Sequence, residues 1–270
     1  MQSDVVYGDP AANAARAVAE IERLAADGVN VVVFPEAFLT GYCAASAEDA
    51  RAIAIPAEHP AIESLCQAAD RFGMLIVAGF AERARDALFN SACILEGSKP
   101  PRFYRKAHLP ELGLDKYVTP GSALPVFETA FGKIGVLICF DLRIPEATRV
   151  LALAGAEVLF LPTNWPQGAE VSAEHMCIAR AAENRIFVAT CDRVGEEGGF
   201  RFIGRSKIIA PSGAVLAAAG DGEETIVAEF DPAQARTKRS VIDPGRFETD
   251  TFATRQPELY RSLVEPLVKP

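Results

Sequence analysis

The stretch DPAANAARAVAEIERLAADGVNVVVF, residues 9–34, shows the unit from which this chain is built. Asp9 followed by Pro10 is typical of a helix N-cap with proline at the first helical position. Apolar residues then recur at helical spacing on one face, and Gly28 favours the end of the helix. The apolar run at 29–34 stops at Pro35 and predicts a buried strand.

The same alternation continues along the rest of the chain. We expect helices over 60–71, 145–154 and 170–184, and strands over 74–80, 87–96, 102–105, 133–138, 157–161, 186–190, 202–210, 214–218 and 224–229. Residues 231–270 are predicted to form an extended tail with short helices. This order favours an α/β fold in a single domain over 1–270, and two αββα-like halves stacked sheet on sheet would fit it.

Composition excludes several classes of protein. The 270 residues include 27 basic and 36 acidic side chains, for a net charge of −9. Phosphate binding needs clustered Lys and Arg, so a nucleic-acid or anionic-membrane partner is not expected. No apolar run approaches the roughly 18–20 residues of a membrane span, and the polar start does not resemble a signal peptide. Six cysteines without CxxC pairs suit reduced thiols, so we expect a cytoplasmic protein.

Three predicted strand ends place a reactive side chain beside a break in the pattern. These side chains are Glu36, Lys106 and Cys139. Singly, they are most simply interpreted as a loop carboxylate or helix cap, a surface lysine and a buried thiol. Together they supply a nucleophile, a base and a cation for a developing oxyanion, without a Cys–His dyad. His108, two residues from Lys106, is interpreted as a structural side chain.

Seven segments carry a family resemblance that runs over essentially the whole chain. They are FPEAFLTGY (34–42), YRKAHLPELG (104–113), GKIGVLICFDLRIPE (132–146), PTNWP (162–166), ARAAENRIFVATCDRVG (179–195), FIGRSKIIAPSGAVL (202–216) and RQPELYRSL (255–263). The chain resembles the nitrilase superfamily of carbon–nitrogen hydrolases, on its amidase- or carbamoylase-like side. The resemblance implies a four-layer αββα sandwich, a homodimer or higher homo-oligomer with the tail at about 231–270 in its contacts, and hydrolysis through a thioacyl enzyme without a metal or organic cofactor.

The resemblance also implies roles for individual residues. Cys139 corresponds to the nucleophile, Glu36 to the general base, Lys106 to the oxyanion-stabilising cation, and the N–H of Phe140 to the rest of the oxyanion hole. Many members carry a second glutamate in the loop that follows the lysine. Here Glu111 or Asp115 could fill that position, and we favour Glu111 for its longer reach. Most of the first strand that relatives normally have is missing, so part of a strand is expected to be lost.

The residues after the nucleophile narrow the reaction. Cys139-Phe140-Asp141 resembles amide and carbamoyl hydrolases, whereas nitrilases typically show Cys-Trp-Glu. A small amide that yields ammonia and a carboxylic acid is therefore the expected substrate. The alternatives, in falling order, are an N-carbamoyl amino acid or amine, a nitrile, and a non-catalytic binding role.

Three further residues are candidates for substrate contact. Arg143 could pair with a substrate carboxylate, or internally with Asp141 or Glu146. Asn164 and Trp165 are predicted to form pocket wall, although an aromatic ring there is as often core packing.

Overall fold

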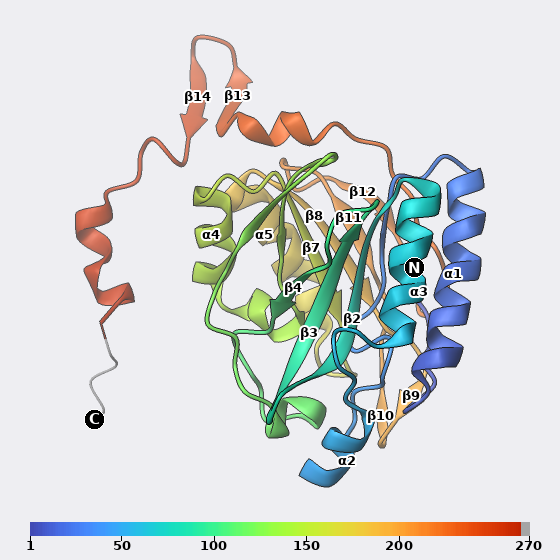
Figure 1. Ribbon diagram of the computed structural model, residues 1–270. Helices are drawn as coiled ribbons and strands as arrows, with labels where there is room; N and C mark the ends of the chain where they lie inside the picture. Colours follow the sequence, from blue (N-terminus) through green and yellow to red (C-terminus); the bar gives the residue numbers. More distant parts are fainter. Residues whose placement is uncertain (266–270) are drawn as a thin grey trace.

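The computed structural model describes residues 1–265 and contains two stacked sheets between layers of helix (Figure 1). Helices α1 and α3 cover the outer face of one sheet, and α4 and α5 cover the other. The helices are α1 (Pro10–Ala26), α2 (Ala47–Ile53), α3 (Pro60–Phe72), α4 (Pro145–Leu153) and α5 (Cys177–Asn184). The expected four-layer αββα arrangement is confirmed.

The two sheets differ in size and direction. The four-stranded sheet has the order β1-β2-β3-β4 and consists of β1 (Val31–Val33), β2 (Leu75–Ala84), β3 (Ala87–Glu96) and β4 (Arg102–Arg105). The six-stranded sheet has the order β12-β11-β8-β7-β6-β5 and consists of β5 (Val126–Thr129), β6 (Gly132–Val136), β7 (Val158–Thr163), β8 (Phe187–Asp192), β11 (Lys207–Ile209) and β12 (Val215–Ala218). Parallel pairing joins β1 to β2 and runs through β6, β7 and β8.

The core follows from the two-residue period of the strands. Leu75 and Val77 of β2 pack in the cluster between the two sheets, whereas Ile76 and Ala78 belong to the cluster under α1 and α3. Successive side chains of a strand point to opposite faces, so residues 75–78 of β2 pack against the two clusters in turn. Because both faces are buried, this part of the strand is continuously apolar. This packing fixes the sheet ends from which the reactive residues emerge.

The predicted helix signals are confirmed by the structure. The Asp9 side chain accepts the Ala12 N–H at the start of α1, and Pro10 is its first residue. Helix α3 ends at Gly73, whose φ of 64° lies in the left-handed region that favours glycine. Pro145 likewise begins α4.

Several predicted boundaries were wrong. The segment 224–229 is not a strand, because its surface position leaves it only an isolated bridge between Gln2 and Glu224. Of the strand predicted at 202–210, only β11 forms. The helix predicted at 170–184 contains a π-helical turn, Ser172–Met176, before α5. Strand β5 and helix α2 were not predicted.

The tail departs from the body of the molecule and is more regular than expected (Figure 1). Its predicted short helices are present as η4 (Pro232–Arg236) and η5 (Pro257–Leu263). Between them lies an unpredicted hairpin of β13 (Arg239–Asp243) and β14 (Phe247–Asp250). Positions 266–270 of the predicted tail lie outside the described residues. Within residues 1–265, no helix has both the length and the apolar character that a membrane crossing requires.

Candidate active site

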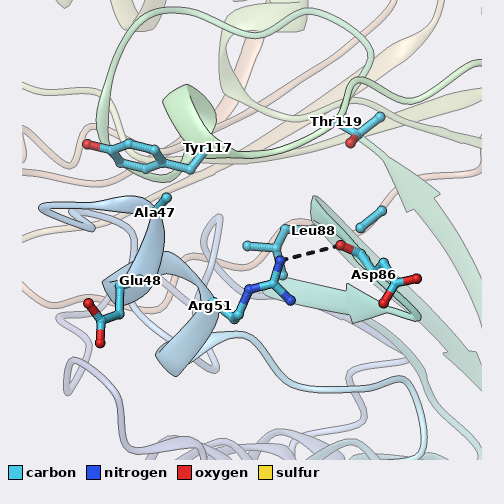
Figure 2. Close-up of a pocket in the computed structure, with 8 residues that line it drawn as sticks. Ala47, Glu48, Arg51, Asp86, Leu88, Tyr117 and Thr119 are labelled. Atoms are coloured by element: carbon cyan, nitrogen blue, oxygen red, sulfur yellow. Dashed lines mark hydrogen bonds between the residues drawn. The ribbon is translucent and has the colours of Figure 1, made fainter.

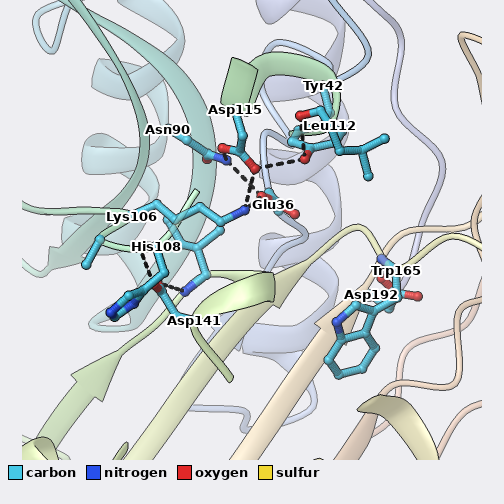
Figure 3. Close-up of polar contacts among 12 residues, drawn as sticks. Glu36, Tyr42, Asn90, Lys106, His108, Leu112, Asp115, Asp141, Trp165 and Asp192 are labelled. Carbon is cyan, nitrogen blue, oxygen red and sulfur yellow. Dashed lines mark hydrogen bonds and ion pairs between the residues drawn. The ribbon is translucent and has the colours of Figure 1, made fainter. Parts of the chain in front are cut away.

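The centre of the site is an ammonium group shared by two carboxylates (Figure 3). Lys106 directly follows β4, and its Nζ lies 2.7 Å from Glu36 Oε1 and 2.6 Å from Asp115 Oδ2. All three side chains are completely buried. The structure thus brings Glu36 and Lys106 together, although they are 70 residues apart in the chain. A buried cluster of charges at strand ends is typical of a functional site.

The two carboxylates have different environments. Asp115 accepts the Asn90 amide at 2.8 Å on one oxygen, and the Tyr42 hydroxyl at 2.8 Å on the oxygen that Lys106 also contacts. Glu36 accepts both Lys106 and Asn90 on Oε1, while its Oε2 has no hydrogen-bond partner within residues 1–265. Asp115 is therefore suited to be a fixed counterion, and Glu36 keeps one oxygen free to take up a proton.

The pKa shifts of Glu36 and Lys106 support these roles. Burial raises the pKa of Glu36, and the nearby charge of Lys106 opposes that shift only in part. Burial alone would lower the pKa of Lys106, but the charges of Asp115 and Glu36 outweigh it, so the pKa of Lys106 is raised. The ammonium group therefore stays protonated, while the raised pKa of Glu36 favours its uptake of a proton.

Cys139 lies at a strained turn just beyond β6. It begins the 3₁₀ turn η2 (Cys139–Arg143), and its φ of 45° is in the left-handed region, which costs a non-glycine residue about 1–3 kcal/mol. The residue remains partly exposed. Burial of its sulfur and the charge of Glu36 raise the pKa of Cys139, and the charge of Lys106 opposes this. Cys139 is thus a thiol that needs a base, within the fields of both other predicted catalytic residues.

The remaining candidates on this side lie close in sequence to the nucleophile or to β7. Phe140, in the first turn of η2, is partly exposed, and the first N–H groups of such a turn have no acceptor within it. Asn164 follows β7 and is buried, with both amide atoms unpaired within the described chain. The Trp165 ring packs in the core cluster between the sheets, and the Trp165 backbone N–H donates to Asp192 Oδ1 at 2.7 Å. Its position therefore favours the packing interpretation.

The structure does not support Glu111 as the second carboxylate of the site. Glu111 is exposed, whereas Asp115 is buried against Lys106. The reason is a turn at Gly113, with φ of 49°, into η1 (Gly113–Tyr117). This 3₁₀ turn directs the shorter side chain inward, so reach did not decide the outcome.

Arg143 is exposed, and the structure does not show the internal pairing that was considered for it. The oxygens of Asp141 are occupied instead by Tyr104, His108 and the Ile138 N–H. The structural interpretation of His108 is consistent with its 2.7 Å contact to Asp141. Arg143 thus remains available to a ligand.

Two residues of the site were missed by sequence reasoning. Asn90 lies in the buried strand β3, and Tyr42 lies in the FPEAFLTGY segment. A polar amide inside a mostly apolar strand is the signal that could have identified Asn90, because buried polar groups need partners. Tyr42 carried no comparable signal.

A surface hollow of about 380 Å³ (Figure 2) is lined by none of the residues of the charged cluster around Lys106. It is lined by α2, by Asp86 and Leu88, and by Tyr117 of η1. Asp115, on the same 3₁₀ turn as Tyr117, contacts Lys106 and does not line the hollow. Across residues 1–265, no three His, Cys, Asp or Glu side chains are grouped to hold a metal ion.

Comparison with known proteins places the chain in a family. The profile of the carbon–nitrogen hydrolases matches residues 1–240. A protein named nitrilase from Pyrococcus abyssi is 38% identical, over 93% of this chain and 94% of its own. An N-carbamoylputrescine amidase from Arabidopsis thaliana is 33% identical, over 95% and 91%. A 2-oxoglutaramate amidase from Bacillus subtilis is 35% identical, over 90% and 93%.

A solved structure supports the fold. The amidase of Nesterenkonia sp. AN1, in a mutant form with acrylamide added at its active-site cysteine, superposes with a TM-score of 0.80 at 24% identity. The match covers 98% of each chain. The chain therefore belongs to the carbon–nitrogen hydrolase family, within the nitrilase superfamily, and is an amidase-like enzyme of that family.

Proposed function

We propose that Cys139, Glu36 and Lys106 are the catalytic triad of an enzyme that hydrolyses a small amide to ammonia and a carboxylic acid. The observation that carries this proposal is the ion-pair cluster around Lys106, in which Glu36 keeps one unpaired oxygen. Asp115 acts as the positioning counterion that holds Lys106 charged. No metal or organic cofactor is required by these steps.

In the acylation half, Glu36 takes the proton of the Cys139 thiol while the sulfur bonds to the amide carbon. The electron pair of the carbonyl moves to oxygen, where Lys106 and the Phe140 N–H stabilise it. The carbon–nitrogen bond then breaks, and the proton held by Glu36 goes to the departing nitrogen. The products are ammonia and a thioester.

In the deacylation half, Glu36 removes a proton from water as the water oxygen bonds to the thioester carbon. The carbon–sulfur bond breaks, and the proton held by Glu36 returns to the sulfur of Cys139. The carboxylic acid leaves and the resting thiol is restored. Acid–base assistance of this kind contributes about 10²–10⁴-fold in rate.

The triad assignment is tested with Cys139→Ala, for which we expect ammonia release to fall by more than about 10⁴-fold. Cys66→Ala is a matched control, because Cys66 is a partly exposed thiol on α3, remote from the site. Circular dichroism of both variants checks the fold. Appreciable turnover by folded Cys139→Ala would refute the assignment of the nucleophile.

The amide preference rests on Cys139-Phe140-Asp141, and the exposed Arg143 supports a substrate with a carboxylate. We expect Arg143→Ala to raise KM for carboxylate-bearing amides and to leave KM for neutral amides unchanged. An equal effect on both would assign Arg143 a structural role. N-carbamoyl substrates are the alternative, and they would release carbon dioxide together with ammonia.

The proposal extends to assembly and location. The tail exposes a set of apolar side chains, namely Val241, Ile242, Phe247, Leu259 and Leu263. Helix α4 exposes Val150 and Leu153. Such surfaces favour burial against a second copy of the chain, so a homodimer or larger homo-oligomer is proposed. The six free cysteines support a cytoplasmic location.

A further inference from the structure

Tyr42 links the charged cluster to the loop that carries it (Figure 3). Its hydroxyl lies 2.8 Å from Asp115 Oδ2 and 3.1 Å from the Leu112 carbonyl oxygen. The same Asp115 oxygen contacts Lys106. The position of the Tyr42 backbone therefore determines whether its hydroxyl reaches Asp115, and Asp115 in turn affects the position of Lys106.

A carboxylate from a distant hairpin holds that backbone. Glu197 ends β9 (Glu196–Glu197), which pairs with β10 (Phe200–Arg201). Its Oε1 accepts the N–H of Tyr42 at 2.8 Å and the N–H of Cys43 at 2.6 Å. Two main-chain donors on one oxygen fix the direction of the loop more tightly than one bond could.

Glu197 is itself fixed by a buried cation. Arg193 Nη1 lies 2.7 Å from Glu197 Oε2, and the two side chains are only 1% and 8% exposed. Arg193 also contacts Asp4 at 2.9 Å and donates to the Val5 carbonyl oxygen. In so little water the pair resists separation, because Glu197 without Arg193 would be a buried carboxylate with no cationic partner in the described chain.

Glycines let these segments approach closely. A methyl group at Gly198 would lie 2.6 Å from Cys43 Cβ, and one at Gly41 would lie 2.5 Å from the Tyr7 ring. Both glycines have positive φ, of 58° and 85°. Space and backbone conformation therefore leave the loop at 41–43 little freedom against the β9–β10 hairpin.

We propose that Glu197 is a positioning residue for catalysis: its ion pair with Arg193 sets the backbone at Tyr42, and Tyr42 sets Asp115 against Lys106. This inference rests on the proposed function, because it assigns Glu197 a role in orienting the triad. Glu197 touches neither Glu36 nor Cys139 by hydrogen bond or ion pair in the described chain, so its effect is transmitted through the loop.

The first test compares three single variants. Glu197→Ala removes the acceptor and the charge, and kcat should fall by about 10- to 100-fold with KM changed less than about twofold. Glu197→Gln keeps an acceptor but loses the charge, so its fall should be smaller. Glu196→Gln is the matched control, because Glu196 is exposed on the same strand, and it should match the wild type. If folded Glu197→Ala keeps wild-type kcat, or if KM alone changes, the proposal is wrong.

A double-mutant cycle tests the route. Tyr42→Phe removes the hydroxyl that contacts Asp115, so combining it with Glu197→Gln should lower kcat little beyond the larger single effect. A purely structural role for Glu197 would instead give effects on log kcat that add. Additive effects would overturn the transmission through Tyr42, even with every variant folded.

A second readout separates this inference from the proposed function. The rate of alkylation of Cys139 by iodoacetamide, followed by peptide mass analysis, requires no substrate. We expect Glu197→Ala to slow it and Glu196→Gln to leave it unchanged. If the wild type hydrolyses no amide but this difference persists, the proposed function fails and the positioning role stands. If amides are hydrolysed but neither kcat nor alkylation responds to Glu197, the positioning role fails alone.

Discussion

The turn that carries Glu36, the proposed base, and the turn that carries Cys139, the proposed nucleophile, are built alike but held differently. Both follow the end of a short strand with parallel neighbours, β1 in one sheet and β6 in the other. Both also contain a non-glycine residue with positive φ, Ala37 at 48° and Cys139 at 45°. The contacts that maintain these strained turns are not the same.

The base turn is held by shape. Gly79 of β2 lies directly against it, and a methyl group there would collide with Ala37 N and lie 2.7 Å from Glu36 Cα. Backbone hydrogen bonds complete the contact, from Gly79 N to Pro35 O and from Leu39 N to Gly79 O. No titratable side chain takes part in this contact.

The nucleophile turn is held by a buried carboxylate. Asp141 accepts the Ile138 N–H at 3.0 Å and the Tyr104 hydroxyl at 2.7 Å on one oxygen. Its other oxygen contacts the N–H and the ring of His108. Steric contact thus positions the turn that carries Glu36, whereas hydrogen bonds to a buried carboxylate position the turn that carries Cys139.

The largest effect is expected from Gly79→Ala. The added methyl group must push the base turn away, and a displacement of about 1 Å costs about 10²-fold in rate. Overpacking should also lower the free energy of unfolding by about 1–3 kcal/mol. Steady-state ammonia release and urea unfolding measure the two. Gly222→Ala, where a methyl group meets nothing within 4 Å, is the control. A fully active Gly79→Ala would show that steric contact at Gly79 does not position the turn that carries Glu36.

A smaller effect is expected from Asp141→Asn. Either orientation of the amide turns an NH₂ group toward donors, so we expect a loss of about 1–3 kcal/mol in unfolding free energy. The rate should fall about tenfold as the Cys139 turn loosens. Unfolding by urea and kcat report these changes. Wild-type behaviour in both would show that Asp141 does not hold the turn.

The smallest effect is expected from His108→Gln, and it should depend on pH. The hydrogen bond to Asp141 raises the pKa of His108, with burial opposing. The charge-dependent stabilisation is therefore complete below the unfolded pKa of about 6.5 and is lost as pH rises through the raised folded value. The Tm difference from wild type should be larger at low than at high pH. His175→Gln, at an exposed residue, is the control. A Tm difference for His108→Gln that stays constant with pH would show that the charge of His108 does not stabilise this turn.

Proline and glycine at the ends of helices made much of the fold predictable. Pro10, Pro60 and Pro145 each begin a helix where expected, because the fixed φ of proline suits the first turn. The β13–β14 hairpin could not be predicted in this way. Most of its side chains are exposed or only half-buried, so no apolar face imposes a two-residue period on the sequence.

The members of the proposed site were suggested by the sequence, but not all of their contacts were. Glu36, Lys106 and Cys139 stood out because strand ends concentrate reactive groups, and the structure brings them into one field. The choice between Glu111 and Asp115 depended on the direction of one 3₁₀ turn, which residue spacing alone does not determine. Glu197 acts across 155 positions from Tyr42, and only the folded chain reveals such a partner.

Glu36 is anchored through one oxygen, and this fixes the order of the proton transfers in which it could take part. If it is the base, every proton that passes between sulfur, nitrogen and water is exchanged at Oε2, since Oε1 is occupied by Lys106 and Asn90. One atom cannot serve two exchanges at once. Ammonia must therefore depart before water is activated, and the thioester waits in the interval, open to any other small nucleophile that enters first.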